Sequence, residues 1–177
     1  MNYGQNENLR VKNQIVKGLF KLLKKEKFSE ISISKLIKTA GVARASYYRN
    51  FDSKEDILEF YFNNLRKDNI DEISSDEIVT LASAPDGAIK TFRIMYKKRK
   101  ELKLLLDNNL GDYIYRLITE MVLEKAGDMP ADSIERYKLY FFSGAMFSVL
   151  VNWINSGAKE SPEEISKIAL KYLQNGI

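Results

Sequence analysis

Cysteine and histidine are both absent from the 177-residue chain. Their absence excludes a disulfide framework, a Cys/His zinc site, a Ser-His-Asp triad and a thiol nucleophile. Only scattered carboxylates, lysines and tyrosines remain as possible catalysts, and no pair of them has a spacing that indicates a catalytic site. We therefore expect a protein that is not an enzyme and that holds neither a metal ion nor a cofactor.

Long hydrophobic runs are missing as well. The apolar stretches fall well short of the roughly 18 residues that span a bilayer, and residues 1–10 are polar, unlike a signal peptide. These features predict a cytoplasmic protein that does not bind a membrane. An apolar content of 45% is ordinary for a globular chain of one or two domains.

Positive charge is concentrated towards the N-terminus. Residues 1–60 hold 12 Lys or Arg and 7 Asp or Glu, a balance of +5, whereas the remainder holds 16 and 17, a balance of −1. Such an asymmetry is typical of a small nucleic-acid-binding module attached to a neutral body. A solvated, lysine-rich helix face would give the same numbers, so charge alone leaves both interpretations open.

Apolar residues recur with helical spacing along most of the chain, which predicts an all-α fold of about nine helices. The first helix covers about residues 10–25. Ser32 caps a second helix that stops at Gly41, and a third runs from about Arg44 to Asn50. A fourth opens at Asp52 or Ser53, where residues 52–55 fit a capping pattern.

The body of the chain is divided by two turn signals, at residues 84–87 and 127–130. We expect helices over residues 88–107, 110–125 and 132–156. Ser161-Pro162-Glu163-Glu164 then introduces a last helix, because it combines a cap, a proline at the first helical position and a glutamate at the third. The acidic segment 67–77 marks the boundary with the basic module, and it lacks the spacing of a calcium loop.

The residues around Gly41 meet the requirements of a helix-turn-helix. The residues expected to face inward are Ile33, Leu36, Ala40, Val42, Tyr47 and Phe51. Those left to face outward are Ala43, Arg44, Ala45, Ser46, Tyr48 and Arg49. Arginine pairs bidentately with guanine, alanine permits close approach or contacts a thymine methyl, and hydroxyls reach phosphates or bases. A helical hairpin in any all-α protein would look similar.

The segment from Ser32 to Leu58 resembles the N-terminal region of the tetracycline-repressor (TetR/AcrR) family of transcriptional regulators. The likeness covers about residues 10–60 and rests on the Ala-Gly-Val turn, the Tyr48/Phe51 pair and the Ser-Lys-Glu that follows. It implies a DNA-binding domain over residues 1–52 and a helical dimerisation and effector domain over residues 53–177. By position, it implies that Ser32 and Tyr48 contact phosphates, that Ala43 to Ser46 meet base edges and that Lys54 anchors the DNA backbone.

Three positions depart from the family pattern. Lys27 stands where the family often has glycine, so we expect a local cost of ~1 kcal/mol if the first helix ends in the same left-handed geometry. Ile37 is bulkier than the usual small residue, and Asn50 replaces a frequent aromatic or histidine. These changes affect packing and base preference but leave the domain assignment in place.

The expected helix 132–156 is apolar on all sides, so more than one side must be covered. The extra face most simply meets a second subunit, together with the last helix, in a four-helix interface. The alternative is a central core helix of a monomer. The predicted interface residues are Phe147, Leu150, Ile154, Ile165, Ile168 and Tyr172.

Aromatic and methionine side chains of the body are candidates for an effector pocket, although such residues form core more often than pocket. The predicted lining is Phe92, Met95, Tyr96, Tyr113, Phe142, Met146 and Trp153. Arg93, Arg116 and Arg136 are candidate partners for an anionic effector, although an arginine on a helix surface is usually solvated. Without histidine, the site has no imidazole switch near neutral pH.

The sequence thus predicts a homodimeric DNA-binding regulator, a repressor released from a palindromic operator by a small apolar or amphipathic effector. The alternative is a TetR-like regulator or activator whose C-terminal domain binds a protein partner instead of a small ligand.

Overall fold

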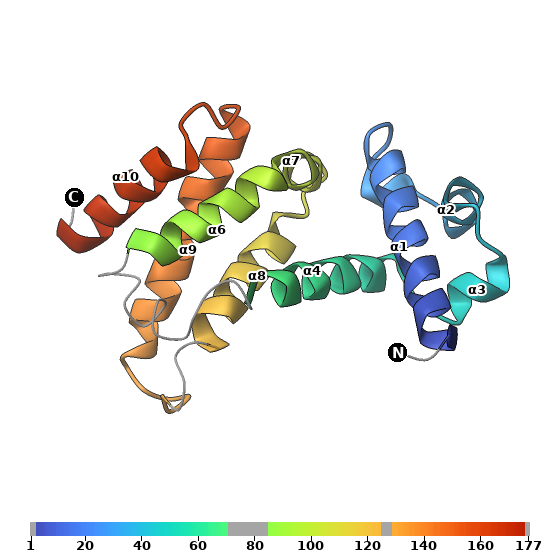
Figure 1. The fold of residues 1–177 in the computed structure, drawn as a ribbon, viewed down its shortest axis with the longest axis horizontal. Helices are drawn as coiled ribbons and strands as arrows, with labels where there is room; N and C mark the ends of the chain where they lie inside the picture. Colours follow the sequence, from blue (N-terminus) through green and yellow to red (C-terminus); the bar gives the residue numbers. More distant parts are fainter. Residues whose placement is uncertain (1–2, 71–84, 125–128, 176–177) are drawn as a thin grey trace. The chain divides into compact units, whose positions relative to one another are not determined.

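The computed structural model describes residues 3–70, 85–124 and 129–175 (Figure 1). Within these ranges the chain forms nine α-helices, one short 3-10 helix and no strand, which confirms the all-α prediction. The chain divides into two compact units, Met1–Asn64 and Leu65–Ile177. No helix in the described ranges is long and apolar enough to cross a membrane.

The first unit is built around the apolar stripe of its first helix. Ile15 and Leu19 on this stripe are fully buried, as is Leu36 on the second helix. The elements are α1 (Tyr3–Leu23), the 3-10 helix η1 (Phe28–Glu30), α2 (Ile33–Ala40), α3 (Arg44–Tyr48) and the beginning of α4 (Lys54–Ile70). The short α3 was predicted to end near Asn50, and η1 was not predicted.

The contact between α1 and α2 depends on a glycine. A Cβ atom placed on Gly18 would lie 2.9 Å from the Cβ of Ala40 and 3.0 Å from its Cα. Real Cβ atoms do not approach other atoms this closely, so the two helices touch backbone to backbone at this point. The last turn of α2, which leads into the helix-turn-helix bend, is therefore held directly against α1.

Helix caps in the first unit follow the predicted positions with one shift. Ser32 caps α2 by accepting a hydrogen bond from the Lys35 amide. The capping box at the start of α4 is formed by Ser53 and Asp56 instead of residues 52 and 55. The Ser53 Oγ accepts a hydrogen bond from the Asp56 amide (3.1 Å), and the Asp56 carboxylate accepts one from the Ser53 amide (3.0 Å). Hydrogen bonds from the Ser53 side chain and backbone lower the pKa of Asp56.

The end of α1 differs from the expectation for Lys27. The helix stops at Leu23, and Lys27 has φ −70° and ψ 147°, which is extended backbone. No left-handed residue is required, so the predicted cost of replacing glycine does not arise.

The second unit contains five helices in addition to the end of α4. Helix α10 packs along α6, and α8 packs along α9 (Figure 1). The predicted capping box at Ser161 and Glu164 is confirmed, since each residue accepts a hydrogen bond from the amide of the other. The helices are α6 (Pro85–Lys97), α7 (Arg99–Asp107), α8 (Gly111–Glu124), α9 (Arg136–Asn155) and α10 (Pro162–Asn175).

Three boundary predictions for the body are wrong. Residues 85–87 form the first turn of α6 instead of a loop, because proline is well suited to the first position of a helix. The expected helix 88–107 is two helices separated at Lys98 (φ −98°, ψ 7°). Helix α9 begins at Arg136, after the turn in which the Ser133 amide donates to the Pro130 carbonyl. Ala84, Gly127, Asp128 and residues 71–77 lie outside the described residues.

Candidate DNA-binding surface and ligand cavity

The bend between α2 and α3 is set by one glycine and one buried tyrosine. Gly41 has φ 67°, the left-handed conformation predicted for the helix end, and nothing lies within 4 Å of the position of a Cβ. Ala43 is extended and precedes α3. Tyr47 is fully buried and anchors α3, and burial raises the pKa of its hydroxyl to about 12, with a further contribution from the negative charge of Asp56.

Anchoring at Tyr47 leaves one face of the helix-turn-helix accessible. The residues predicted to contact DNA and found exposed are Ser32, Ala43, Arg44, Ala45, Tyr48 and Arg49. Ser46 and Lys54 are half-buried. The predicted inward residues Leu36, Tyr47 and Phe51 are buried, whereas Ile33, Ala40 and Val42 are half-buried.

Arg44 and Tyr48 form a pair on this exposed face. The Arg44 Nη2 donates to the Tyr48 hydroxyl over 3.3 Å, and the guanidinium carbon lies 5.5 Å from the ring centroid. The Tyr48 ring in turn meets the buried Tyr47 edge-on at a centroid distance of 5.2 Å. The arginine therefore rests on a side chain that is fixed to the core, which restricts the directions in which its guanidinium extends.

Asn50 closes the end of the short helix. Its Nδ2 donates to the Ser46 carbonyl over 2.7 Å. This bond fixes the backbone of a residue in the middle of the exposed face. Asn50, which departs from the family pattern, therefore has a structural role in this chain that was not predicted from the sequence.

Lys54 joins the start of α4 to η1. Its ammonium donates to the Phe28 carbonyl over 2.8 Å and lies 4.7 Å from the Phe28 ring centroid. The predicted anchor for the DNA backbone is thus also an internal brace. Because an ammonium carries three donors, this bond leaves capacity for a phosphate.

We expect Lys54→Ala to lower both stability and DNA affinity, since it removes the brace and a positive charge. DNA affinity should fall evenly across sequences, and the slope of log affinity against log salt should become shallower by about one unit for each subunit. Lys54→Gln is the control, because it keeps a side-chain N–H donor and most of the length of the lysine but carries no charge. An unchanged salt slope in both variants would show that Lys54 acts only inside the protein.

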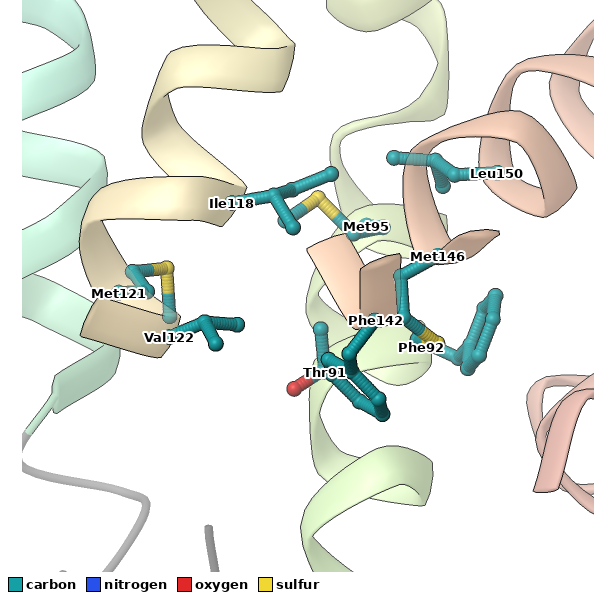
Figure 2. A pocket seen from close by; sticks show the side chains of 9 residues that line it. All are labelled: Thr91, Phe92, Met95, Ile118, Met121, Val122, Phe142, Met146 and Leu150. Carbon is teal, nitrogen blue, oxygen red and sulfur yellow. The ribbon is translucent and has the colours of Figure 1, made fainter. Parts of the chain in front are cut away.

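A cavity lies between α6, α8 and α9 of the second unit (Figure 2). The empty space at this site is about 540 Å³, a volume that includes space open to solvent. Figure 2 shows the α8 side chains opposite those of α6 and α9. The lining residues are Thr91, Phe92, Met95, Ile118, Met121, Val122, Phe142, Met146 and Leu150.

Four of the seven predicted pocket residues line this cavity: Phe92, Met95, Phe142 and Met146. Trp153 and Tyr96 do not line it. Instead, Trp153 packs edge-on against Phe92 (centroids 5.5 Å apart) and stacks on Tyr96 (5.9 Å). Tyr113 is also outside the lining, beneath the Arg116 guanidinium at 4.9 Å.

Sequence reasoning missed the α8 wall of the cavity. Ile118, Met121 and Val122 stand at i, i+3 and i+4, the spacing of one helix face, and this signal was available. The prediction followed aromatic and methionine residues, so it passed over the aliphatic Ile118 and Val122, and it did not include Met121. The hydroxyl of Thr91 was missed for the same reason.

The predicted interface residues separate into buried and exposed groups. Leu150, Ile154 and Ile165 are buried by residues of their own chain, and Phe147 is half-buried against Tyr115. Ile168 and Tyr172 on α10 are 45% and 56% exposed. Further large apolar side chains are exposed near and on the first turns of α9, namely Ile134, Tyr137, Tyr140 and Phe141.

A helix-turn-helix with arginines and hydroxyls on its exposed face, followed by a helical unit with an apolar cavity, defines a DNA-binding regulator. Two family models match the chain. "Bacterial regulatory proteins, tetR family" covers residues 15–60, and "Transcriptional regulator C-terminal region" covers residues 82–175. The chain therefore belongs to the TetR family of transcriptional regulators.

Solved structures with the same fold include a TetR transcriptional regulator from Streptococcus agalactiae 2603V, with 17% identity, a TM-score of 0.65 and coverage of 96% of this chain and 97% of that one. The fatty acid degradation regulator FadR from Bacillus halodurans has 20% identity, a TM-score of 0.62 and coverage of 94% and 96%. The dihydroxyacetone kinase operon activator DhaS has 17% identity, a TM-score of 0.60 and coverage of 92% and 93%. A comparison with curated proteins gave no match.

Proposed function

We propose that this regulator is a homodimeric repressor that leaves a palindromic operator when a small apolar or amphipathic molecule occupies the cavity of the second unit. The apolar cavity between α6, α8 and α9 carries this proposal, since an apolar lining with one polar group is typical of a site for a small ligand. Because its target is chromosomal DNA, we place the protein in the cytoplasm.

On the DNA side, the proposed contacts come from the exposed face of the helix-turn-helix. Arg44 reads base edges in the major groove, Ala43 and Ala45 permit close approach, and Ser46 contacts bases or phosphates. Ser32, Tyr48, Arg49 and Lys54 bind the DNA backbone. Two copies of this face would read half-sites one helical turn apart, roughly 34 Å.

On the dimer side, the exposed apolar side chains of α9 and α10 favour association with a second copy. Tyr137 and Phe141 are 73% and 74% exposed, which is unusual for aromatic residues one helical turn apart. Together with Ile168 and Tyr172 they form the interface that we propose, in place of the predicted interface residues that are buried within the chain. Analytical ultracentrifugation should give a dimer at micromolar concentration, and a monomer would contradict the proposal.

Helix α8 supplies the proposed connection between the cavity and the DNA-binding unit. One face of α8 lines the cavity, while Glu120 and Glu124 face Arg66 of α4, with Nη1 to Oε2 distances of 3.6 and 3.9 Å. Helix α4 is continuous from Lys54 to Ile70, so it begins in the first unit and ends in the second. A ligand that displaces α8 would change these ion pairs and shift the population of α4 conformations.

This connection predicts non-additive variants. We expect Met121→Phe, which fills the cavity from α8, to weaken operator binding, and Arg66→Gln to reduce that effect by at least half in the double variant. Met129→Phe is the matched control, because Met129 does not line the cavity. Operator binding measured by fluorescence anisotropy gives the cycle, and strictly additive effects would exclude Arg66 as the link.

A second candidate function is activation through a protein partner of the C-terminal domain. The name of one structural neighbour, an operon activator, supports this alternative, as do the exposed aromatic residues at the start of α9. A protein that remained monomeric, showed no stabilisation by a metabolite panel and raised transcription would favour it.

The decisive experiment for the proposed repressor is titration with promoter fragments from the source chromosome, followed by an effector screen for release. We expect nanomolar binding to a fragment that contains an inverted repeat. Tight binding without release by any compound would exclude ligand-controlled repression and leave the DNA-binding function intact.

A further inference from the structure

Among the residues that the structure describes, the lining of the cavity in the second unit contains no ionisable side chain. Eight of the nine lining residues are apolar, and Thr91 supplies the one hydroxyl. An unpaired charge in such surroundings costs several kcal/mol, so a ligand would enter in its neutral form. A single oxygen on the ligand would find a partner at Thr91, because a hydroxyl both donates and accepts hydrogen bonds.

Several charged residues on the helices that build the cavity contact other groups. On α6, the Arg93 Nε lies 2.6 Å from the Glu163 carboxylate of α10. At the start of α9, the Arg136 guanidinium donates to two backbone carbonyls, those of Met129 and Pro130, over 2.8 Å each. On α8, Arg116 lies over Tyr113, while Glu120 and Glu124 face Arg66. The three arginines considered for an anionic effector are thus all in contact with other groups.

The walls are also adaptable. Three of the five methionines of the chain line the cavity, namely Met95, Met121 and Met146. Methionine has three rotatable bonds and a polarisable sulfur, so it adjusts its shape to a flexible chain better than a branched side chain does. In Figure 2 these methionines come from three different helices and line separate parts of the wall. Such a wall fits an aliphatic chain more readily than a rigid polar ring.

We propose that the cavity binds a neutral aliphatic molecule with one oxygen function, of the class of long-chain alcohols, ketones and esters, and rejects the carboxylate of the same chain. This inference rests on the proposed function, since it names the chemical class of the effector. The Thr91 hydroxyl bonds to the ligand oxygen, and the methionine-rich walls enclose the chain.

Trp153 offers a direct signal for occupancy. It is the one tryptophan of the chain, is 2% exposed and packs edge-on against Phe92, whose ring lines the cavity. A ligand that displaces Phe92 changes the surroundings of the indole. Tryptophan emission therefore reports binding independently of DNA.

The test compares 1-decanol with decanoate, using the full chain between pH 6 and pH 8. We expect 1-decanol to shift Trp153 emission with the same affinity throughout, because none of the described lining residues is ionisable and the chain has no histidine. A carboxyl group of ordinary pKa is neutral in roughly one molecule in 500 at pH 7. Decanoate should therefore bind at least about 100-fold more weakly at pH 7 and gain about tenfold for each unit by which the pH falls.

Two variants locate the ligand. Met121→Phe should weaken 1-decanol binding by about tenfold or more, since it occupies the cavity, whereas Met129→Phe should not change it. Thr91→Val keeps the shape of the side chain and should weaken binding by roughly 2- to 10-fold, the usual value of one hydrogen bond. Should Met121→Phe fail to fold, Thr91→Val still tests the site.

Equal binding of decanoate and 1-decanol at pH 7 would overturn the inference, because it would place the head group in solvent. Failure of both ligands to bind, or binding unaffected by both cavity variants, would also overturn it. If 1-decanol binds in the cavity but leaves operator affinity unchanged, the ligand class stands and the proposed release mechanism fails.

Discussion

Gly18→Val should unfold the first unit and abolish DNA binding. Even the single methyl of Gly18→Ala would place a Cβ 2.9 Å from the Cβ of Ala40 and 3.1 Å from its amide nitrogen. Backbone cannot move aside as a side chain does, so α2 must shift away from α1. Overpacking of this kind costs about 1–3 kcal/mol, which exceeds the ~1 kcal/mol that alanine gains over glycine in a helix. Valine adds two more methyl groups at the same place.

The matched control is Gly144→Ala in α9, because nothing lies within 4 Å of the Cβ position there. This variant should keep or raise stability by up to about 1 kcal/mol. Thermal unfolding followed by circular dichroism compares the two. Ala40→Gly in the Gly18→Ala background should restore only part of the lost stability, since the Cα and amide nitrogen of residue 40 remain in place. Equal melting temperatures for Gly18→Ala and wild type would contradict the close contact.

Whether a feature of the fold could be predicted from the sequence depends on how far apart in the chain the interacting residues are. Caps and turns at Ser32, Gly41 and Ser161 were predicted because each depends on a few neighbouring residues. The close contact at Gly18 was not predicted, since it depends on Ala40, which is 22 positions away in the chain. A helical glycine without a local role is a signal of close packing, but its partner becomes known only in the folded chain.

The candidate sites show the same division. The exposed face around Arg44 followed from a local motif and a family resemblance. The cavity required three helices that are distant in sequence, so aromatic and methionine content predicted part of its wall and none of the α8 residues that line it. Leu150 illustrates the limit: its place on an apolar helix suggested a subunit interface, whereas the fold turns it towards the cavity. Periodicity gives the apolar faces of a helix but not what covers each of them.

Arg44→Ala should produce the largest change in DNA sequence preference. Arg44 is exposed near the start of α3 and is held against Tyr48, so its guanidinium is arranged before DNA binds. A bidentate contact to guanine is worth about 1–3 kcal/mol of discrimination. We therefore expect binding-site selection with Arg44→Ala to return sites in which one position of each half-site has lost its preference, at a cost of roughly 5- to 150-fold in affinity for each half-site.

Charge and shape at this position can be separated with two further variants. Arg44→Lys keeps the positive charge but not the planar fork, so it should retain the salt dependence of binding and still lose the guanine preference. Tyr48→Phe keeps the ring beneath the guanidinium but removes the hydroxyl that accepts from Nη2, so it should weaken the preference without abolishing it. A selected site identical to that of the wild type for Arg44→Ala would exclude a base-reading role. In that case the preference must come from the other residues of this face, such as Ala45, Ser46 and Arg49, or from the deformability of the operator.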